Sequence, residues 1–156
     1  MRSEDSLTTT EALAACRPHP HAEANILRAL LMIQQAHRYV PAEALPKIAH
    51  VLGMTEADVA GVLSYYPDLR TSPPGRHVIR VCMGESCMAN HCPAVFHAVE
   101  ACVRLRNGEI TNQTPFTLEK VHCVGNCALS PTVVVDQDIH GRVEPAQVPP
   151  LLERYR

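Results

Sequence analysis

Two pairs of cysteines constrain this chain more than any other feature of its sequence. Cys82 and Cys87 are separated by four residues, and Cys123 and Cys127 are separated by three. Each pair closes a short apolar run that is typical of a β-strand, so each pair is expected on the loop where a strand ends. Two such loops at one edge of a sheet can offer four thiolates to a single site, as an iron–sulfur cluster or a structural zinc requires.

The spacing within the pairs bears on which metal group the site would hold. Structural zinc sites usually take each ligand pair from a tight knuckle, most often with two intervening residues. Here the gaps are four and three residues. Two irons bridged by sulfides spread their ligands more widely than one tetrahedral ion. The spacing therefore favours a [2Fe–2S] cluster over zinc, and it ranks a pair of disulfides behind both.

Composition narrows the class of protein. The chain has 156 residues, of which 46% are hydrophobic and 19% charged, as in a soluble globular protein of one ordinary domain or two small ones. The net charge of −2 gives no electrostatic basis for binding nucleic acid or a membrane surface. No signal peptide or span of roughly 20 apolar residues is visible, so we expect a cytoplasmic protein without direct membrane insertion. In that reducing compartment, seven cysteines indicate metal ligands rather than a disulfide framework.

The sequence pattern divides the chain into four parts. Residues 1–21 are expected to form a flexible N-terminal arm that carries Cys16. Residues 22–66 have the helical period of a small bundle, with Thr55-Glu-Ala-Asp58 as a capping box for its third helix. Residues 67–76 are rich in Pro and Gly and are expected to be a linker. Residues 77–156 predict an α/β (α+β) fold with the element order β, α, β, β, α, thioredoxin-like in outline.

The same pattern predicts individual elements. The third helix has a helix-turn-helix cadence but no Arg, Lys, Asn or Gln to reach DNA, so we expect it to dock on a protein partner instead. In the second half we expect strands at 77–82, 116–121 and 132–136, a helix beginning near Asn90, a turn at 137–141, a short strand around 142–144 and a closing helix around 146–155.

Other residues near the two pairs compete for a role as ligands. Cys92 follows Cys87 with the same gap of four residues, but Cys82 is preferred because it ends a strand, as Cys123 does. Cys92 and Cys102 are expected to pack in a helix as small hydrophobes. His91 and His122 each precede a cysteine directly, and their side chains should leave on another face.

His122 is instead expected at the rim of the cluster, where it would tune the reduction potential. The loops should wrap the cluster with positive φ and inward N–H groups, and an apolar lip should limit the access of water. The residues expected in these loop and lip roles are Gly84, Gly125, Asn126, Ala128, Leu129 and Pro131.

The cysteines follow the frame C-x4-C and C-x3-C, with 35 residues between the two pairs, and the helical segments "QQAHRYVP", "ALPKIAHVLGM" and "VAGVLSYY" precede them. This arrangement resembles the thioredoxin-like [2Fe–2S] subunit of NADH-dehydrogenase modules. The resemblance implies one [2Fe–2S] cluster on Cys82, Cys87, Cys123 and Cys127. It also implies docking on a beta-type subunit with FMN, an NAD site and further iron–sulfur clusters. "GRHVIRVC" and "VHCVGNCALSPTVVVD" are most similar to the gamma subunit of NAD-dependent formate dehydrogenase, whose alpha-type subunit carries a molybdenum cofactor.

From these features we expect an electron-transfer subunit that has no turnover of its own. The alternatives within the family are the equivalent diaphorase subunit of an NAD-linked hydrogenase or of complex I. The alternatives of another class are a zinc-stabilised binding module and a redox-sensing transcription factor.

Overall fold

The computed structural model describes residues 22–104 and 115–156, so the expected arm with Cys16 lies outside the described residues. The chain divides into two compact units, Met1–Pro73 and Pro74–Arg156. The helices in the described part are all too short or too polar to cross a membrane.

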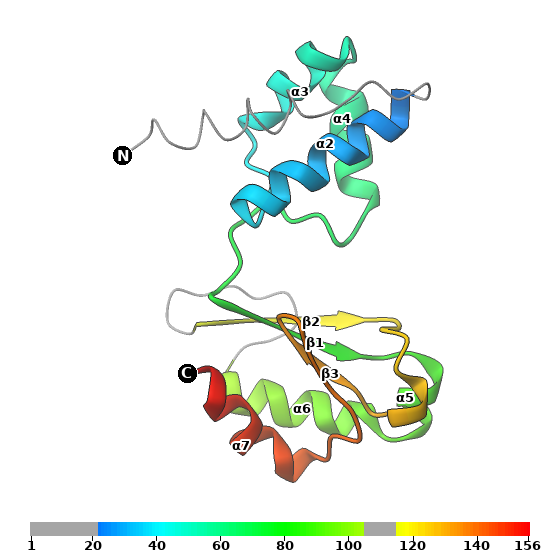
Figure 1. Ribbon diagram of the computed structural model, residues 1–156, viewed down its shortest axis with the longest axis vertical. Coiled ribbons are helices and arrows are strands. Elements are labelled where there is room, and N and C mark those ends of the chain that lie inside the picture. Colours follow the sequence, from blue (N-terminus) through cyan, green and yellow to red (C-terminus); the bar gives the residue numbers. More distant parts are fainter. Residues whose placement is uncertain (1–21, 105–114) are drawn as a thin grey trace. The chain divides into compact units, whose positions relative to one another are not determined.

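The helical unit contains α2 (Ala22–His37), α3 (Ala44–Leu52) and α4 (Glu56–Tyr65) (Figure 1). Each helix turns its apolar residues toward the other two, because none of these short helices can bury such a stripe alone. Leu31 of α2 is apolar but 48% exposed. It follows Leu30 by one residue, so it lies about 100° further round the helix. The buried residues of this unit are Ile26, Ala29, Leu30, Ile33, Val40, Ala44, Ile48, Ala49, Val59, Leu63 and Leu69.

The predicted turn between α3 and α4 is confirmed in detail. Gly53 adopts the left-handed conformation with φ 65°, and its N–H donates to the carbonyl oxygens at the end of α3. Thr55 and Asp58 form the capping box: the Asp58 N–H donates to Thr55 Oγ1 (3.2 Å), and the Thr55 N–H donates to Asp58 Oδ2 (3.0 Å). The hydrogen bonds from Thr55 lower the pKa of the Asp58 carboxyl.

The first part of the expected linker packs on the helical unit. Leu69 is buried in its core, and the Val40 N–H donates to the carbonyl oxygen of Arg70 (2.7 Å). The Gln34 side chain donates to the carbonyl oxygen of Asp68 (2.8 Å) and accepts from the Arg70 N–H (2.7 Å). Residues 68–70 therefore belong to the helical unit, and the chain passes to the second unit only after them.

The second unit is built on a four-stranded sheet with the order β2-β1-β3-β4. The predicted strands at 77–82 and 116–121 are confirmed as β1 and β2, which pair in parallel with Cys82 opposite Val121. The predicted apolar strand is confirmed as β3, which lies inside the sheet, antiparallel to both of its neighbours. The strands are β1 (His77–Cys82), β2 (Phe116–Val121), β3 (Val133–Val135) and β4 (Asp138–His140).

The prediction of a strand around 142–144 is wrong. The chain turns directly after β3, at Asp136 and Gln137, and β4 begins at Asp138. Asp136 takes the left-handed conformation (φ 55°), which aspartate tolerates, so a two-residue turn forms at 136–137 and β4 occupies residues 138–140, inside the expected turn at 137–141. Val143, in the middle of the expected strand, lies beyond β4 and packs into the core.

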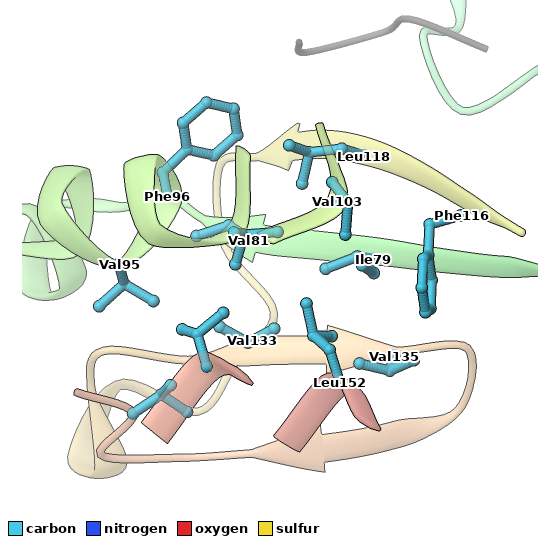
Figure 2. Packing of buried hydrophobic residues seen from close by; sticks show 13 residues of the cluster. Ile79, Val81, Val95, Phe96, Val103, Phe116, Leu118, Val133, Val135 and Leu152 are labelled. Atoms are coloured by element: carbon cyan, nitrogen blue, oxygen red, sulfur yellow. The ribbon is translucent and has the colours of Figure 1, made fainter. Parts of the chain in front are cut away.

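The core of the second unit lies between the sheet and two helices that cover the same face, α6 (Cys92–Val103) and α7 (Val148–Leu152) (Figure 1). The expected closing helix is divided, because α7 lies between the 3-10 turns η2 (Pro145–Gln147) and η3 (Glu153–Tyr155). The thioredoxin-like outline is confirmed. Figure 2 shows the packing of Ile79, Val81, Val95, Phe96, Val103, Phe116, Leu118, Val133, Val135 and Leu152.

Candidate metal centre

All four cysteines of the two pairs line one cavity of about 530 Å³ at the edge of the sheet. Because β1 and β2 are parallel neighbours, their C-terminal ends lie side by side and bring the two loops together. We call residues 82–87 the first loop and residues 123–127 the second loop. The other residues that line the cavity are Met83, Gly84, Glu85, Ser86 and His122.

The first loop holds its two thiols inside the protein. Cys82 is the last residue of β1 and is 3% exposed. Gly84 then begins a short helix, α5 (Glu85–Ala89), which carries Cys87 with 2% exposure. Helix α5 is not among the predicted elements, since five residues are too few to show a helical period. A Cβ atom added at Gly84 would collide with the carbonyl oxygen of His122, so glycine allows the two loops to approach.

The second loop holds its two thiols at the surface. Cys123 and Cys127 are both exposed, and their Sγ atoms lie 3.9 Å apart. Two sulfurs on one tetrahedral ion with bonds of about 2.3 Å lie roughly 3.8 Å apart, so these two thiols are spaced to share one metal ion. Gly125 takes a positive φ of 80°, and its N–H donates to Cys123 Sγ (3.4 Å). Gly125 thus matches the expected wrapping of a metal group by the backbone, whereas the expectation of positive φ is wrong for Gly84 (φ −67°) and Asn126 (φ −100°).

Three polar side chains tie the second loop to α5. The Ser86 hydroxyl donates to the carbonyl oxygen of Cys127 (3.1 Å) and lies 3.0 Å from the Ser130 hydroxyl. Asn90 donates from Nδ2 to Ser130 Oγ (2.9 Å) and to the carbonyl oxygen of Ser86 (2.8 Å). This network was not predicted from the sequence. The only trace of this network in the sequence is that Asn90 follows Ser86 by four residues, about one helical turn.

The chain beyond β4 holds the other side of the second loop. Gly141 lies against Leu129, where an added Cβ atom would come within 2.6 Å of Leu129 Cβ. The Arg142 N–H donates to the carbonyl oxygen of Leu129 (2.6 Å), and the Asn126 side chain donates to Thr132 Oγ1 (3.3 Å). The second loop is therefore exposed but anchored at its C-terminal end, from two sides.

The expected apolar lip is placed differently from the prediction. Ala128 and Leu129 lie in the 3-10 turn η1 (Cys127–Leu129) and are exposed, and neither they nor Pro131 line the cavity. The turn directs these side chains outward, because Leu129 packs toward Gly141 rather than over the thiols.

The two histidines adjacent to cysteines have different positions. His122 lines the cavity and is exposed, which is the rim position expected from the sequence. His91 caps α6 in the left-handed conformation (φ 62°) and does not line the cavity.

Outside the two loops, the described cysteines Cys92 and Cys102 pack as predicted. Cys92 is fully buried, with its Sγ 3.6 Å from Met83 Sδ and 3.5 Å from Met88 Sδ. Cys102 is half-buried against the core of the sheet.

One thiol in each loop, that of Cys87 and that of Cys127, has a raised pKa. Burial raises the pKa of the Cys87 thiol to about 11. Hydrogen bonding to the Cys123 thiol and repulsion between the two thiolates raise the pKa of Cys127. Binding of a metal group must therefore displace protons.

The donor set fits a group that requires four thiolates, since each loop offers two sulfurs to the same cavity. Within residues 22–104 and 115–156, no three His, Cys, Asp or Glu side chains are grouped closely enough to hold a single metal ion, so the four thiols are spread more widely than one ion requires.

The profile of the thioredoxin-like [2Fe–2S] ferredoxin family matches residues 11–156. The chain belongs to this family. It is 37% identical over 130 residues to the E subunit of NADH-quinone oxidoreductase from Escherichia coli (strain K12), covering 83% of this chain and 78% of the relative. It is 32% identical over 136 residues to the HndA subunit of the NADP-reducing hydrogenase from Solidesulfovibrio fructosivorans, and the match covers 87% of this chain and 80% of the relative.

A solved structure has the same fold. A chain of the NAD+-reducing [NiFe]-hydrogenase in its air-oxidized state superposes on 83% of this chain with a TM-score of 0.68 and 20% identity. This chain spans only 22% of the length of that hydrogenase chain, so the similarity concerns the fold of one part of it.

Proposed function

We propose that Cys82, Cys87, Cys123 and Cys127 hold one [2Fe–2S] cluster and that this chain is an electron-transfer subunit. The observation that carries the proposal is that two loops place four thiols around one cavity in a member of a [2Fe–2S] ferredoxin family. When bound, such a cluster takes up and releases one electron at a time.

The residues around the cavity define what the protein contributes. Cys82 and Cys87 hold the inner side of the site away from water, whereas Cys123 and Cys127 leave the outer side open to a partner. The Gly125 N–H, directed at Cys123 Sγ, stabilises negative charge on that sulfur and so raises the reduction potential. We expect a low potential, on the order of −400 mV, for an all-cysteine site of this kind.

We propose a partner subunit that carries FMN and an NAD site. The named relatives support this, since one belongs to an NADH-quinone oxidoreductase and the other to an NADP-reducing hydrogenase. These relatives favour a diaphorase-type subunit of a complex-I-like or hydrogenase complex. Membership in a formate dehydrogenase, with a molybdenum-containing alpha-type subunit, stays a prediction from the sequence resemblance.

Anaerobic purification tests the cluster directly. We expect coloured protein with two irons and two sulfides per chain, and an electron paramagnetic resonance signal after reduction with dithionite. As a control, replacement of Cys102 by alanine should leave the iron content of the protein unchanged, because Cys102 lies outside both loops. Colourless protein that contains one zinc would instead establish the zinc-stabilised module, and metal-free protein would disprove both.

The host complex requires a separate experiment. The tagged chain is purified anaerobically with its natural partners, and NAD+ reduction is measured with dihydrogen and with formate, alongside quinone reduction by NADH. Activity with dihydrogen or with NADH and quinone is the expected result. Activity with formate alone would support the formate dehydrogenase instead.

A further inference from the structure

A third buried thiol lies beside the inner side of the cavity. Cys92 has no exposed surface and packs in one buried cluster with Cys82 and Cys87. The remaining members of that cluster are apolar, namely Met83, Val121 and Val124. Among the described cysteines outside the two loops, Cys102 packs in the core of the sheet instead, so Cys92 alone adjoins the candidate ligands.

The contacts of the Cys92 thiol are weak ones. Its Sγ atom lies 3.5 Å from Met88 Sδ and 3.6 Å from Met83 Sδ, and a thioether is only a weak hydrogen-bond acceptor. Methionine side chains are also unbranched and adapt readily to a changed neighbour. A rotation of the Cys92 side chain therefore gives up little.

The path of the backbone also favours an exchange between Cys92 and Cys87. Both flank a short turn in which α5 ends at Ala89 and α6 begins at Cys92. His91 joins the two helices in the left-handed conformation, and Met88 is 45% exposed, so this turn lies at the surface. Cys82, in contrast, is fixed at the end of β1 by pairing with β2. Cys92 follows Cys87 with the same four-residue gap that separates Cys87 from Cys82.

From this arrangement we propose that Cys92 is a reserve ligand of the cluster, which replaces Cys87 when the Cys87 sulfur is lost. The inference rests on the proposed function, because it requires a cluster in this cavity. The alternative ligand set is Cys82, Cys92, Cys123 and Cys127. The exchange needs no oxidant or reductant: the Cys92 thiol loses its proton to solvent as its sulfur forms the metal bond that Cys87 would have made.

Alanine variants test the proposal, since a serine oxygen could itself bind iron. We expect Cys87→Ala to retain at least half of the wild-type iron and sulfide, with resonance Raman bands of four-sulfur ligation. The double variant Cys87→Ala/Cys92→Ala should fall below a tenth of the wild-type iron. The matched control Cys87→Ala/Cys102→Ala should behave like Cys87→Ala, because Cys102 lies on the same helix but packs elsewhere.

Cys87→Val is a second variant that fills the buried space, in case Cys87→Ala does not fold. If neither Cys87 variant retains the cluster, or if removal of Cys92 makes no difference to them, the proposal is wrong. The proposed function is judged separately, from the wild type and from Cys92→Ala. Both should contain the full cluster, and a wild type without iron would overturn the function rather than the reserve ligand alone.

Discussion

The two cysteine loops present the same chemical groups in opposite settings. The thiols of the first loop are 3% and 2% exposed and belong to the buried interior, whereas both thiols of the second loop are exposed. The first loop is fixed by β1, α5 and the buried packing between them. The second loop depends on a few hydrogen bonds from Ser86, Asn90 and Arg142. The protein thus builds one wall of the site as core and the other as an anchored surface loop.

The largest expected difference concerns the loss of one ligand from each loop. Cys127→Ala should reduce the iron content at least tenfold, because the described residues include no further cysteine beside the second loop. Cys87→Ala should retain most of its iron through Cys92. Iron and sulfide analysis, together with the visible spectrum, measures the cluster content of both variants. Equal losses of iron would show that the two loops do not differ in their tolerance of a lost ligand.

The two loop glycines test how each wall is built. Gly84→Ala forces a methyl group into the carbonyl oxygen of His122, so we expect a loss of about 2–3 kcal/mol in the free energy of unfolding and a weakened cluster. Gly125→Ala meets no atom within 4 Å, and its φ of 80° should cost only about 1–2 kcal/mol. Urea denaturation of the metal-free variants checks the order, and a larger effect at Gly125 would contradict it.

Alkylation of the metal-free protein should separate the loops by rate. Iodoacetamide reacts with thiolates, so exposed Cys123 should be labelled at least tenfold faster than buried Cys87 at pH 8. Because burial raises the pKa of Cys87 to about 11, its labelling should rise about tenfold per pH unit between pH 8 and 10. Mass spectrometry of the labelled peptides gives both rates. A pH-independent rate for Cys87 would show that access limits the reaction instead.

The smallest expected effect concerns the tie between the loops. Ser86→Ala removes the hydrogen bonds to the Cys127 carbonyl and to Ser130, which should cost about 1 kcal/mol and speed the release of iron to a chelator. Ser64→Ala is the matched control, because Ser64 donates a hydrogen bond to Gly61 within the helical unit. Its rate of iron release should equal that of the wild type. Equal rates for Ser86→Ala and Ser64→Ala would show that the second loop does not depend on this tie.

Sequence patterns located the features that depend on local chemistry. Strands β1 and β2 were predicted to the residue, because each short run rich in apolar residues ends at or just before a cysteine pair. The capping box of α4 was predicted because Thr55 and Asp58 bond within one turn. The sequence also predicted that the two cysteine pairs come from the ends of two strands at one edge of the sheet.

Features that depend on tertiary context were not predictable. Helix α5 has five residues, too few for a period, and β4 was misplaced because the chain turns at Asp136 and Gln137 rather than over residues 137–141. The difference in exposure between the loops has no sequence signal, since both contain small residues. The contacts of Ser86 with Cys127 and Ser130 span 41 and 44 residues, and such pairs leave no local pattern.

The in-register pairing of β1 with β2 restricts where residues can be inserted or deleted in this chain. Side chains alternate between the two faces of a strand, so one inserted or deleted residue inside β1 would turn Cys82, its last residue, to the opposite face. An insertion or deletion inside β2 would likewise shift Cys123, which follows Val121 by two residues, relative to the first loop, although every cysteine is still present in the sequence. Tolerated length changes should therefore avoid the interiors of these two strands.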